Sequence, residues 1–334
     1  MIDGGIRLNT IKLGLIGLGA IGKTHLRNSQ KATKSKIISV ADLSEGSIKF
    51  AKEMGVPNVY KDYKEMLKQA DLDAVIVCLP TFLHNQCIDD ICDSGKDILM
   101  EKPLARNPSE GKNIVDKVRS HNLKLMVGYP LRFAPYLLDA KSEIDSGDLG
   151  FIENVHAVRI GSGPYSHRTE NGYPVQVPDW WFSKEKTGGG ALLDTGCHMI
   201  NLLRWYFGDI KKIYGVLGYK YGLEVEDQAL CIVEFDNGTK GTITVNWTSQ
   251  TDLLKVDLYG TVSNRMIYRK PVWKPVRALQ LLFGPSESTS FFREIEYFSE
   301  CIIKDVYPEP SGEDGLKDLF AIESVYQKVI DTFE

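Results

Sequence analysis

The sequence predicts an α/β protein of two domains, a doubly wound parallel sheet in residues 1–128 and an open sheet in residues 129–334. Up to residue 127, short and continuously apolar runs alternate with segments of helical character. Beyond residue 129, longer runs alternate polar with apolar residues. The length of 334 residues agrees with two domains, because single hydrophobic cores stop growing at roughly 250–300 residues.

Five apolar runs indicate buried strands in the first domain: 11–16, 37–41, 74–79, 96–100 and 124–127. Segments 47–54, 82–93 and 109–121 are predicted to be helices. Alternating strands and helices predict a parallel sheet covered on both faces, with ligands bound beyond the carboxyl ends of the strands. We therefore expect the residues that follow strand ends, Gly19, Asp42, Thr81 and Lys102, to meet at one edge of the sheet.

The turn after the first strand has the pattern GxGxxG, as Gly17-Leu18-Gly19-Ala20-Ile21-Gly22. Gly17 permits a tight turn, Gly19 lets the backbone approach a pyrophosphate, and Gly22 allows close packing of helix on strand. A helix that begins near Ala20 offers free N–H groups and its positive dipole end to phosphates. Because the pattern alone occurs by chance, the flanking strand and helix carry the prediction of a dinucleotide site.

Asp42 closes the second strand, 25 positions after Gly17. A carboxylate there accepts hydrogen bonds from the adenosine ribose hydroxyls and repels a 2′-phosphate. No arginine follows it, since Leu43 and Ser44 come next. The sequence therefore favours NAD over NADP as cofactor, and the alternative is that Asp42 is only a turn residue.

The second domain contains predicted strands at 152–160, 213–218, 229–235, 241–248 and 254–259. Asp236-Asn237-Gly238 indicates a hairpin with a primed turn, because Asn-Gly tolerates positive φ angles. In the strand after it, Ile243, Val245 and Trp247 point one way and Thr242, Thr244 and Asn246 the other. A helix is predicted over 191–207, with Gly188-Gly189-Gly190 as a flexible lead into it, and the segment 315–332 is predicted to be a further helix.

Composition excludes several classes of protein. A net charge of −4 gives no basic face for nucleic acid. The apolar runs are too short to span a membrane, and residues 1–10 do not have the pattern of a secretory signal. The six cysteines form no CxxC pair and are predicted to be reduced thiols of a cytoplasmic protein. An open sheet with few helices leaves one face free, which favours association of copies of the chain.

Six segments in order then carry a family resemblance: the GxGxxG turn, Pro80-Thr81 to His84, Glu101-Lys102-Pro103, Gly128 to Phe133, the glycine run leading into Asp194-Thr195-Gly196-Cys197-His198, and Pro310-Ser311-Gly312-Glu313-Asp314. The chain resembles the Gfo/Idh/MocA oxidoreductases, the family of glucose–fructose oxidoreductase and myo-inositol dehydrogenase. The resemblance implies a Rossmann domain, then an α/β domain with a large, open, mostly antiparallel sheet, in homodimers or homotetramers. It also implies hydride transfer between a nicotinamide and a secondary alcohol of a sugar, cyclic polyol or sugar nucleotide.

Removing hydride from an alcohol carbon requires a base for the hydroxyl proton, and His198 is the natural candidate. The resemblance implies that Lys102 faces the reacting oxygen, where it stabilises negative charge, or relays the proton if burial lowers its pKa. Asp194, four residues before His198, is predicted to orient the imidazole or bind a substrate hydroxyl. The alternatives are a pair that only stabilises its helix and a solvated lysine.

We expect the cofactor to contact the following residues: Gly17, Gly19, Ala20, Ile21, Gly22, Asp42, Leu79, Pro80, Thr81, His84, Glu101 and Lys102. We expect the substrate to contact Lys102, Arg132, Trp181, Asp194, His198 and Asn201. Many family members have Asp where this chain has Asn201, which argues against a simple inositol dehydrogenase. The aromatic and basic stretch from Tyr165 to Trp181 either stacks on a sugar ring or binds a nucleotide diphosphate, or it is a packed loop. We expect no metal, because no third ligand is near Asp194 and His198.

Two other functions stay open at this point. An enzyme of the same fold uses tightly held NAD for a transient oxidation, so that free NADH does not accumulate. A non-catalytic sensor binds the cofactor without turning over a substrate. Retention of Lys102, Asp194 and His198 argues against the sensor.

Overall fold

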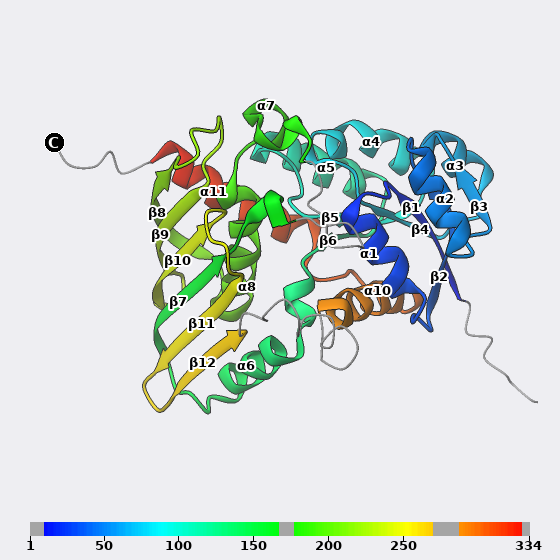
Figure 1. Ribbon diagram of the computed structural model, residues 1–334. Coiled ribbons are helices and arrows are strands. Elements are labelled where there is room, and N and C mark those ends of the chain that lie inside the picture. The colour runs from blue at the N-terminus through cyan, green and yellow to red at the C-terminus, as the bar shows by residue number, and fades with distance from the viewer. Residues whose placement is uncertain (1–9, 167–176, 270–286, 329–334) are drawn as a thin grey trace, which may run out of the picture.

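The computed structural model of the protein describes residues 10–166, 177–269 and 287–328, and has two six-stranded sheets (Figure 1). The first sheet has the order β3-β2-β1-β4-β5-β6 with all strands parallel. Its strands are β1 (Ile11–Ile16), β2 (Ser35–Ala41), β3 (Asn58–Tyr60), β4 (Ala74–Val77), β5 (Asp97–Glu101) and β6 (Leu125–Gly128). This is the doubly wound sheet that the sequence predicts, with the strand order reversing beside β1.

Five helices connect these strands: α1 (Ala20–Ser29), α2 (Glu45–Glu53), α3 (Tyr63–Gln69), α4 (Thr81–Asp93) and α5 (Pro108–Ser120). Side chains of Ser44, Asp62 and Asn107 cap α2, α3 and α5 by accepting from backbone N–H groups of the first turn. The sequence pattern does not predict β3 or α3. Both are short, and β3 has no buried residue, so neither produces a clear apolar pattern.

The second sheet has the order β12-β11-β7-β10-β9-β8, and only β7 and β10 pair in parallel. Its strands are β7 (Ile152–Ile160), β8 (Ile210–Gly218), β9 (Gln228–Phe235), β10 (Lys240–Asn246), β11 (Leu253–Gly260) and β12 (Asn264–Arg269). Of these strands, β12 is not predicted from the sequence pattern. The smaller elements before and beside the sheet are η1 (Pro130–Phe133), α6 (Pro135–Ser146), η2 (Gly163–Ser166), η3 (Asp179–Phe182), α7 (Lys184–Thr187), the π-helical turn η4 (Leu192–Gly196) and α8 (Cys197–Phe207).

The predicted hairpin joins β9 to β10, but its turn is not of the primed type. Gly238 has a φ of 97°, whereas Asn237 does not have a positive φ. The Gly238 N–H donates to the Phe235 carbonyl, and the Phe235 N–H to that of Thr239. This is the three-residue loop in which an ordinary turn is followed by a glycine bulge.

Two helices near the carboxyl terminus pack back onto the first domain. α10 (Glu287–Ile303) lies against α1 and η1, and its Ile295 and Phe298 are buried with Leu13 and Leu15 of β1. α11 (Gly312–Gln327) contacts α5 and β6 of the first domain and α8 and β8 of the second. The boundary at residue 128 separates the two sheets. Helices that cover the first sheet come both from the first domain and from the carboxyl-terminal part of the chain.

On one face of the second sheet, no helix of the described residues is packed (Figure 1). The alternation predicted for β10 is found, since Ile243 and Val245 are buried while Thr242 and Thr244 are partly exposed. Strand register places large apolar side chains of neighbouring strands on the same exposed face: Tyr214, Val216, Leu230, Ile232, Met266 and Tyr268. We call these six residues the outer-face cluster. The face is therefore polar only along its centre.

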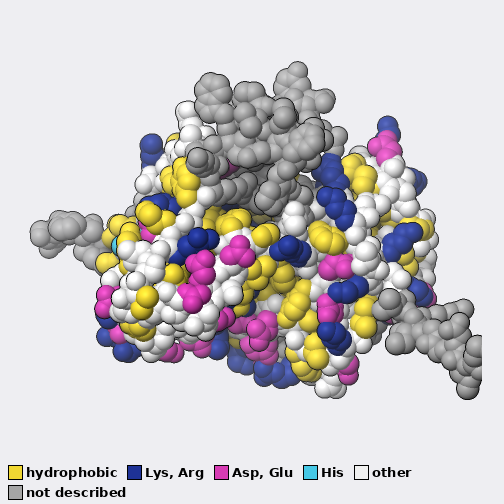
Figure 2. All heavy atoms as spheres, turned by 90° about the horizontal axis from the view of Figure 1, so that it is seen from below, with side chains coloured by type: hydrophobic (Ala, Val, Ile, Leu, Met, Phe, Trp, Pro, Cys, Tyr) yellow, Lys and Arg dark blue, Asp and Glu magenta, His cyan; other side chains and the backbone are white. Residues whose placement is uncertain are grey.

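The molecular surface is mixed in character on the side of α6 and α10. Figure 2 shows hydrophobic side chains gathered near the middle of that view, with Lys, Arg, Asp and Glu interspersed on both flanks. Within the described residues, no helix combines the length and the apolar character needed to cross a bilayer.

Candidate active site

A cleft of about 910 Å³ opens beyond the carboxyl ends of β1, β2, β4 and β5. The volume lies within the roughly 300–1,000 Å³ of small-molecule and cofactor sites. Residues of the second domain form the opposite wall: Pro178, Trp180, Trp181, Thr187, Gly189, Leu193, Asp194 and Trp247. The strand-end residues Gly19, Asp42, Thr81 and Lys102 all line the cleft. They meet at one edge, as the strand pattern predicts.

The glycine turn between β1 and α1 provides a place for an anion. Gly17 has a φ of 88°, and a Cβ on Gly22 would lie 2.1 Å from the Gly17 carbonyl oxygen. A Cβ on Gly19, by contrast, would meet nothing within 4 Å. Gly19 is also the N-cap of α1 and offers no capping side chain. The first-turn N–H groups of α1 therefore face open space, which fits a pyrophosphate.

Asp42 lies at the end of β2, in the cleft wall, and its carboxylate is fixed by the backbone. Oδ2 accepts from the Leu18 N–H at 2.6 Å and Oδ1 from the Ser44 N–H at 2.7 Å. Each oxygen keeps a second lone pair for a ligand hydroxyl. Lys61 also lines the cleft, where it forms an ion pair with Glu45. The structure fits a ribose with free hydroxyls beside Asp42.

Lys102 follows β5, and its ammonium group bridges to the second domain. Nζ donates to Asp194 Oδ1 at 2.7 Å and to the Asp194 carbonyl at 2.9 Å. Burial acts to lower the pKa of Lys102, but the charge of Asp194 and its hydrogen bond outweigh burial, so the net pKa lies above its ordinary value. The condition for a proton relay by Lys102, a pKa lowered by burial, is therefore not met. Lys102 is held as a cation.

His198, in the first turn of α8, has the opposite electrostatic character. Burial lowers the pKa of His198 well below its ordinary value, and the charges of Lys102 and Arg159 lower it further. Its ring packs edge-on against Tyr129 at 5.9 Å, and its buried Nδ1 has no hydrogen-bond partner among the described residues. The imidazole is therefore neutral at pH 7 and able to accept a proton. His198 does not line the cleft of 910 Å³ itself.

The expected contact between Asp194 and the imidazole is not found. Asp194 uses Oδ1 for Lys102 and accepts at Oδ2 from the Thr195 hydroxyl at 3.3 Å. Asp194 lies in the π-helical turn η4, so the four-residue spacing to His198 no longer places both side chains on one face as in an α-helix. Trp247 Nε1 donates to Thr195 at 3.2 Å and extends this polar chain. The spacing of residues in the sequence does not predict that Thr195 and Trp247 take part in this chain of hydrogen bonds.

The predicted cofactor residues divide into two groups. Most line the cleft: Gly17, Gly19, Ala20, Ile21, Asp42, Leu79, Pro80, Thr81, Glu101 and Lys102. Gly22 and His84 lie behind its wall. The buried His84 ring makes contacts of 3.1 Å to the Leu104 carbonyl and 3.0 Å to the Leu79 carbonyl, and burial lowers its pKa. His84 therefore ties the start of α4 to the loop after the cis peptide Lys102–Pro103.

Trp180 and Trp181 form an aromatic wall of the cleft. Their rings stack at 5.0 Å with 22° between the planes, and Trp180 meets Phe82 edge-on at 6.0 Å. Trp181 was predicted to contact the substrate, and it lines the cleft. His167, Arg168 and Tyr173 of the same stretch lie outside the described residues.

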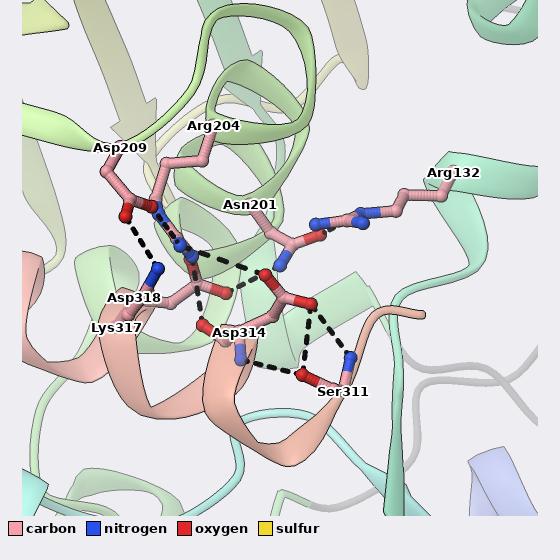
Figure 3. A network of polar contacts seen from close by, with 8 residues as sticks. All are labelled: Arg132, Asn201, Arg204, Asp209, Ser311, Asp314, Lys317 and Asp318. Atoms are coloured by element: carbon pink, nitrogen blue, oxygen red, sulfur yellow. Dashed lines mark hydrogen bonds and ion pairs between the residues drawn. The ribbon is translucent and has the colours of Figure 1, made fainter. Parts of the chain in front are cut away.

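The structure does not bring Arg132 and Asn201 to the cleft. Arg132 Nε donates to Asn201 Oδ1 at 2.7 Å, and Asn201 Nδ2 donates to Asp318 at 2.7 Å (Figure 3). Asn201 is fully buried. Because both polar atoms of its amide bond protein groups, Asn201 joins η1, α8 and α11 rather than facing the cleft. Neither Arg132 nor Asn201 lines the cleft, so we do not expect either residue to contact the substrate.

The glycine run before η4 is closely packed rather than flexible. A Cβ on Gly188, Gly189 or Gly190 would lie within 2.2 Å of Arg106, Tyr326 or Glu226 respectively. The Gly190 N–H donates to the Glu226 carboxylate at 3.0 Å. The run therefore fixes the segment that carries Asp194.

The chain was compared with known proteins. Residues 11–129 match an oxidoreductase family with an NAD-binding Rossmann fold, and residues 137–263 match the GFO/IDH/MocA C-terminal domain. The two matches span more than half of the sequence. The chain belongs to the Gfo/Idh/MocA family. This Gfo/Idh/MocA protein is an oxidoreductase, which confirms the predicted family and enzyme class.

Relatives of this Gfo/Idh/MocA protein differ in their substrates. It is 27% identical to a scyllo-inositol 2-dehydrogenase (NAD(+)) of Bacillus subtilis, with 87% of this chain and 86% of the relative covered. It is 23% identical to D-xylose 1-dehydrogenase (NADP(+)) 2 of Haloferax volcanii, with 94% and 96% covered. The solved structure of a levoglucosan dehydrogenase with NADH and levoglucosan superposes with a TM-score of 0.81 at 22% identity, covering 95% and 96%. That structural likeness supports the fold.

Proposed function

We propose that this protein transfers hydride between NAD and a secondary alcohol of a sugar, cyclic polyol or sugar nucleotide. The observation that carries the proposal is the position of Lys102. Its ammonium group is held by Asp194 at the carboxyl end of β5, in the cleft where the first turn of α1 offers its N–H groups. A fixed cation at that place suits an alcohol oxygen that gains negative charge during oxidation.

Two residues share the handling of the substrate hydroxyl in this proposal. Lys102 donates a hydrogen bond to the oxygen and stabilises its developing charge, while neutral His198 accepts the hydroxyl proton. NAD, when bound, accepts the hydride. Asp194 keeps the Lys102 ammonium in place and charged. Closeness of Lys102 and His198 is supported by the effect of the lysine charge on the histidine pKa.

A preference for NAD over NADP is part of the proposal. The Asp42 carboxylate is fixed by two backbone N–H groups and exposes its remaining lone pairs in the cleft. A 2′-phosphate there would meet a fixed negative charge. Relatives with either cofactor in their names exist, so the residue at this position is what supports NAD here.

A cyclic, hydroxyl-rich substrate fits the second-domain wall. Trp180 and Trp181 present stacked rings to the cleft, and aromatic faces pack well on the apolar face of a sugar or inositol ring. The names of the relatives include inositol, levoglucosan and xylose. The six free thiols support a reducing compartment, and we propose the cytoplasm as the location.

The test is a screen of NAD reduction against a panel of sugars, inositols and UDP-sugars. We expect free NADH to accumulate with at least one member of the panel. Turnover of a substrate with no release of NADH would instead identify the enzyme with tightly held cofactor. The sensor would be favoured by two results together: the protein binds NADH but turns over no member of the panel, and Lys102→Ala leaves NADH binding unchanged.

A further inference from the structure

Three titratable side chains from distant parts of the chain meet beneath the cleft. They are His25 of α1, Glu101 at the end of β5 and Glu294 of α10, and their potential ligand atoms all lie within 4.8 Å of one another. His25 and Glu294 are fully buried and Glu101 is 7% exposed. His25 Nε2 and Glu101 Oε1 are 2.7 Å apart, the length of a hydrogen bond. We call these residues the His25–Glu101–Glu294 cluster.

Within the described part of the chain, no opposite charge stabilises a buried carboxylate at Glu294. Among the described residues, no side chain hydrogen-bonds either of its carboxyl oxygens. A buried carboxyl group without a charged partner favours its protonated form. Burial and the charge of Glu101 raise the pKa of Glu294 well above its ordinary value, and the Tyr129 backbone N–H opposes them only in part. Burial raises the pKa of the Cys78 thiol well above its ordinary value, and the carboxyl groups of Glu101 and Glu294 raise it further.

Glu101 is the member of the cluster that reaches the cleft. It lines the cleft wall, and its Oε2 accepts from the Lys102 backbone N–H at 3.2 Å. Gly128 makes room for it, because a Cβ there would lie 3.3 Å from the Glu101 carboxyl group. The orientation of Glu101 therefore affects both the cleft surface and the backbone that carries Lys102.

We propose that Glu294 is a positioning residue, a neutral carboxylic acid that keeps its proton and donates it in a hydrogen bond to Glu101, so that Glu294 and His25 together fix the Glu101 carboxylate beside Lys102. The inference rests on the proposed function, since Glu101 and Lys102 belong to the same proposed site. In this proposal, α10 both packs on the first domain and positions Glu101. The proton satisfies both carboxyl groups, because one donates and the other accepts.

The alternative occupant of the cluster is a divalent metal ion. Ligands bound to zinc at about 2.0–2.2 Å in a tetrahedron lie about 3.3–3.6 Å from one another. The observed 2.7 Å between His25 Nε2 and Glu101 Oε1 is too short for that arrangement. Among the described residues the cluster also has only three candidate ligands. The geometry favours a shared proton.

Two substitutions of Glu294 separate the possibilities. Glu294→Gln keeps a neutral donor at the same place, whereas Glu294→Leu removes it at similar volume. We expect Glu294→Leu to weaken NADH binding about tenfold or more, as for a lost hydrogen bond to a charged group. We expect Glu294→Gln to stay within about threefold of the wild type, and kcat to follow the same pattern. Fluorescence titration of NADH and steady-state kinetics measure both.

The matched control is Glu296→Ala on the same helix. Glu296 bonds the backbone N–H groups of Thr33 and Lys34 at 2.6 and 3.0 Å, so its loss removes a contact between α10 and the first domain without touching the cluster. We expect its NADH binding to equal that of the wild type. Equal loss in Glu296→Ala and Glu294→Leu would show a merely structural role for Glu294 and overturn the proposal.

Infrared spectroscopy tests the proton directly and needs no substrate. The wild type should show the C=O band of a protonated carboxylic acid at neutral pH, and Glu294→Gln should lack that band. No difference in this region, a Gln variant as impaired as the Leu variant, or a stoichiometric metal lost in Glu294→Gln would each overturn the proposal. If the band and NADH binding behave as expected while no substrate is oxidised, only the proposed function fails.

Discussion

At the residue scale, two basic groups in one site have opposite protonation states for physical reasons. Lys102 is paired with a carboxylate at 2.7 Å, so its charge is stabilised despite burial. Among the described residues, no carboxylate pairs with His198. Burial and the nearby charge of Lys102 therefore disfavour its charged form. In the proposed function, this pair supplies the fixed cation and the neutral base that the oxidation of an alcohol requires.

Alanine at either position should affect turnover far more than cofactor binding. We expect Lys102→Ala and His198→Ala each to lower kcat by roughly 10²–10⁴-fold, because each removes a group that acts on the substrate hydroxyl. The affinity for NADH, measured by fluorescence, should change little. Near wild-type turnover in either variant on the true substrate would show that the residue has been assigned the wrong role.

The pH profile follows from the lowered pKa of His198. The imidazole accepts a proton only when neutral, and its folded-state pKa lies well below 6.5. Alcohol oxidation should therefore keep full kcat/KM from pH 7 down through pH 6.5 and lose it only at lower pH. A profile of kcat/KM measured between pH 5 and 9 checks this. An acid limb centred at or above pH 6.5 would contradict a buried neutral base.

Asp42 should control the choice of cofactor. Replacing it by Ala removes a carboxylate that the backbone holds in the cleft, and with it the repulsion of a 2′-phosphate. Loss of a hydrogen bond to a charged group costs roughly 1.5–3 kcal/mol, so the ratio of NAD to NADP affinity should fall about tenfold or more. Binding constants for both reduced cofactors measure the ratio. A wild type that prefers NADP would refute this assignment.

At the scale of elements, the buried polar network between α8 and α11 holds the second domain to the final helix. Arg204 donates to Asp318 at 2.6 Å, to Asp209 at 2.6 Å and to the Asp314 carbonyl at 2.9 Å (Figure 3). Asp314 also forms a capping box with Ser311 at the start of α11. The Pro310–Asp314 segment, which is part of the family resemblance, therefore caps α11 and contacts α8.

Breaking this network should destabilise the protein strongly. Arg204→Met leaves Asp318 buried with 1% exposure and without its cation, and removing one partner of a buried pair costs roughly 3–5 kcal/mol. Lys317→Ala is the control, since its ion pair with Asp209 is exposed and is worth about 0–1 kcal/mol. Urea unfolding gives both free energies. Similar small losses in the two variants would show that Arg204 contributes no more than a surface pair.

At the scale of the whole molecule, the outer face of the second sheet is the surface most suited to association. The outer-face cluster exposes apolar side chains on β8, β9 and β12 beside a polar centre. Extended apolar faces of this kind commonly pack against a second copy of the chain. The oligomeric state remains a prediction.

We expect at least a dimer in solution at micromolar concentration. Ile232, a member of the outer-face cluster on β9, is 58% exposed, and Ile232→Lys places a charge there that should shift the protein toward monomer. Val306→Lys, at an exposed apolar site after α10, should leave the assembly unchanged. Sedimentation velocity distinguishes the species. A wild-type monomer, or a dimer that both variants retain, would exclude this face as the interface.

Much of the first domain and its cleft edge was predictable because local rules decide it. The glycine turn needs a positive φ at Gly17 and contact distances that only Gly22 permits, and both requirements appear as residue types in the sequence. Asp42 and Lys102 follow apolar strands directly, so parallel pairing alone places them at one edge. The alternation of strands and helices predicts the parallel pairing of these strands, whereas their order in the sheet comes from the structure.

Tertiary structure decided the features that depend on segments far apart in the chain. Asp194 pairs with Lys102 across 92 positions instead of orienting His198, and the partners of Asn201 lie on η1 and α11. The glycines 188–190 are needed because Arg106, Glu226 and Tyr326 pack on them. A short-range pattern encodes which backbone a residue prefers, whereas the partner of a buried charge depends on packing between domains. The sequence therefore determined the fold class, the family and the strand-end residues, and the three-dimensional packing decided which of the candidate side chains meet.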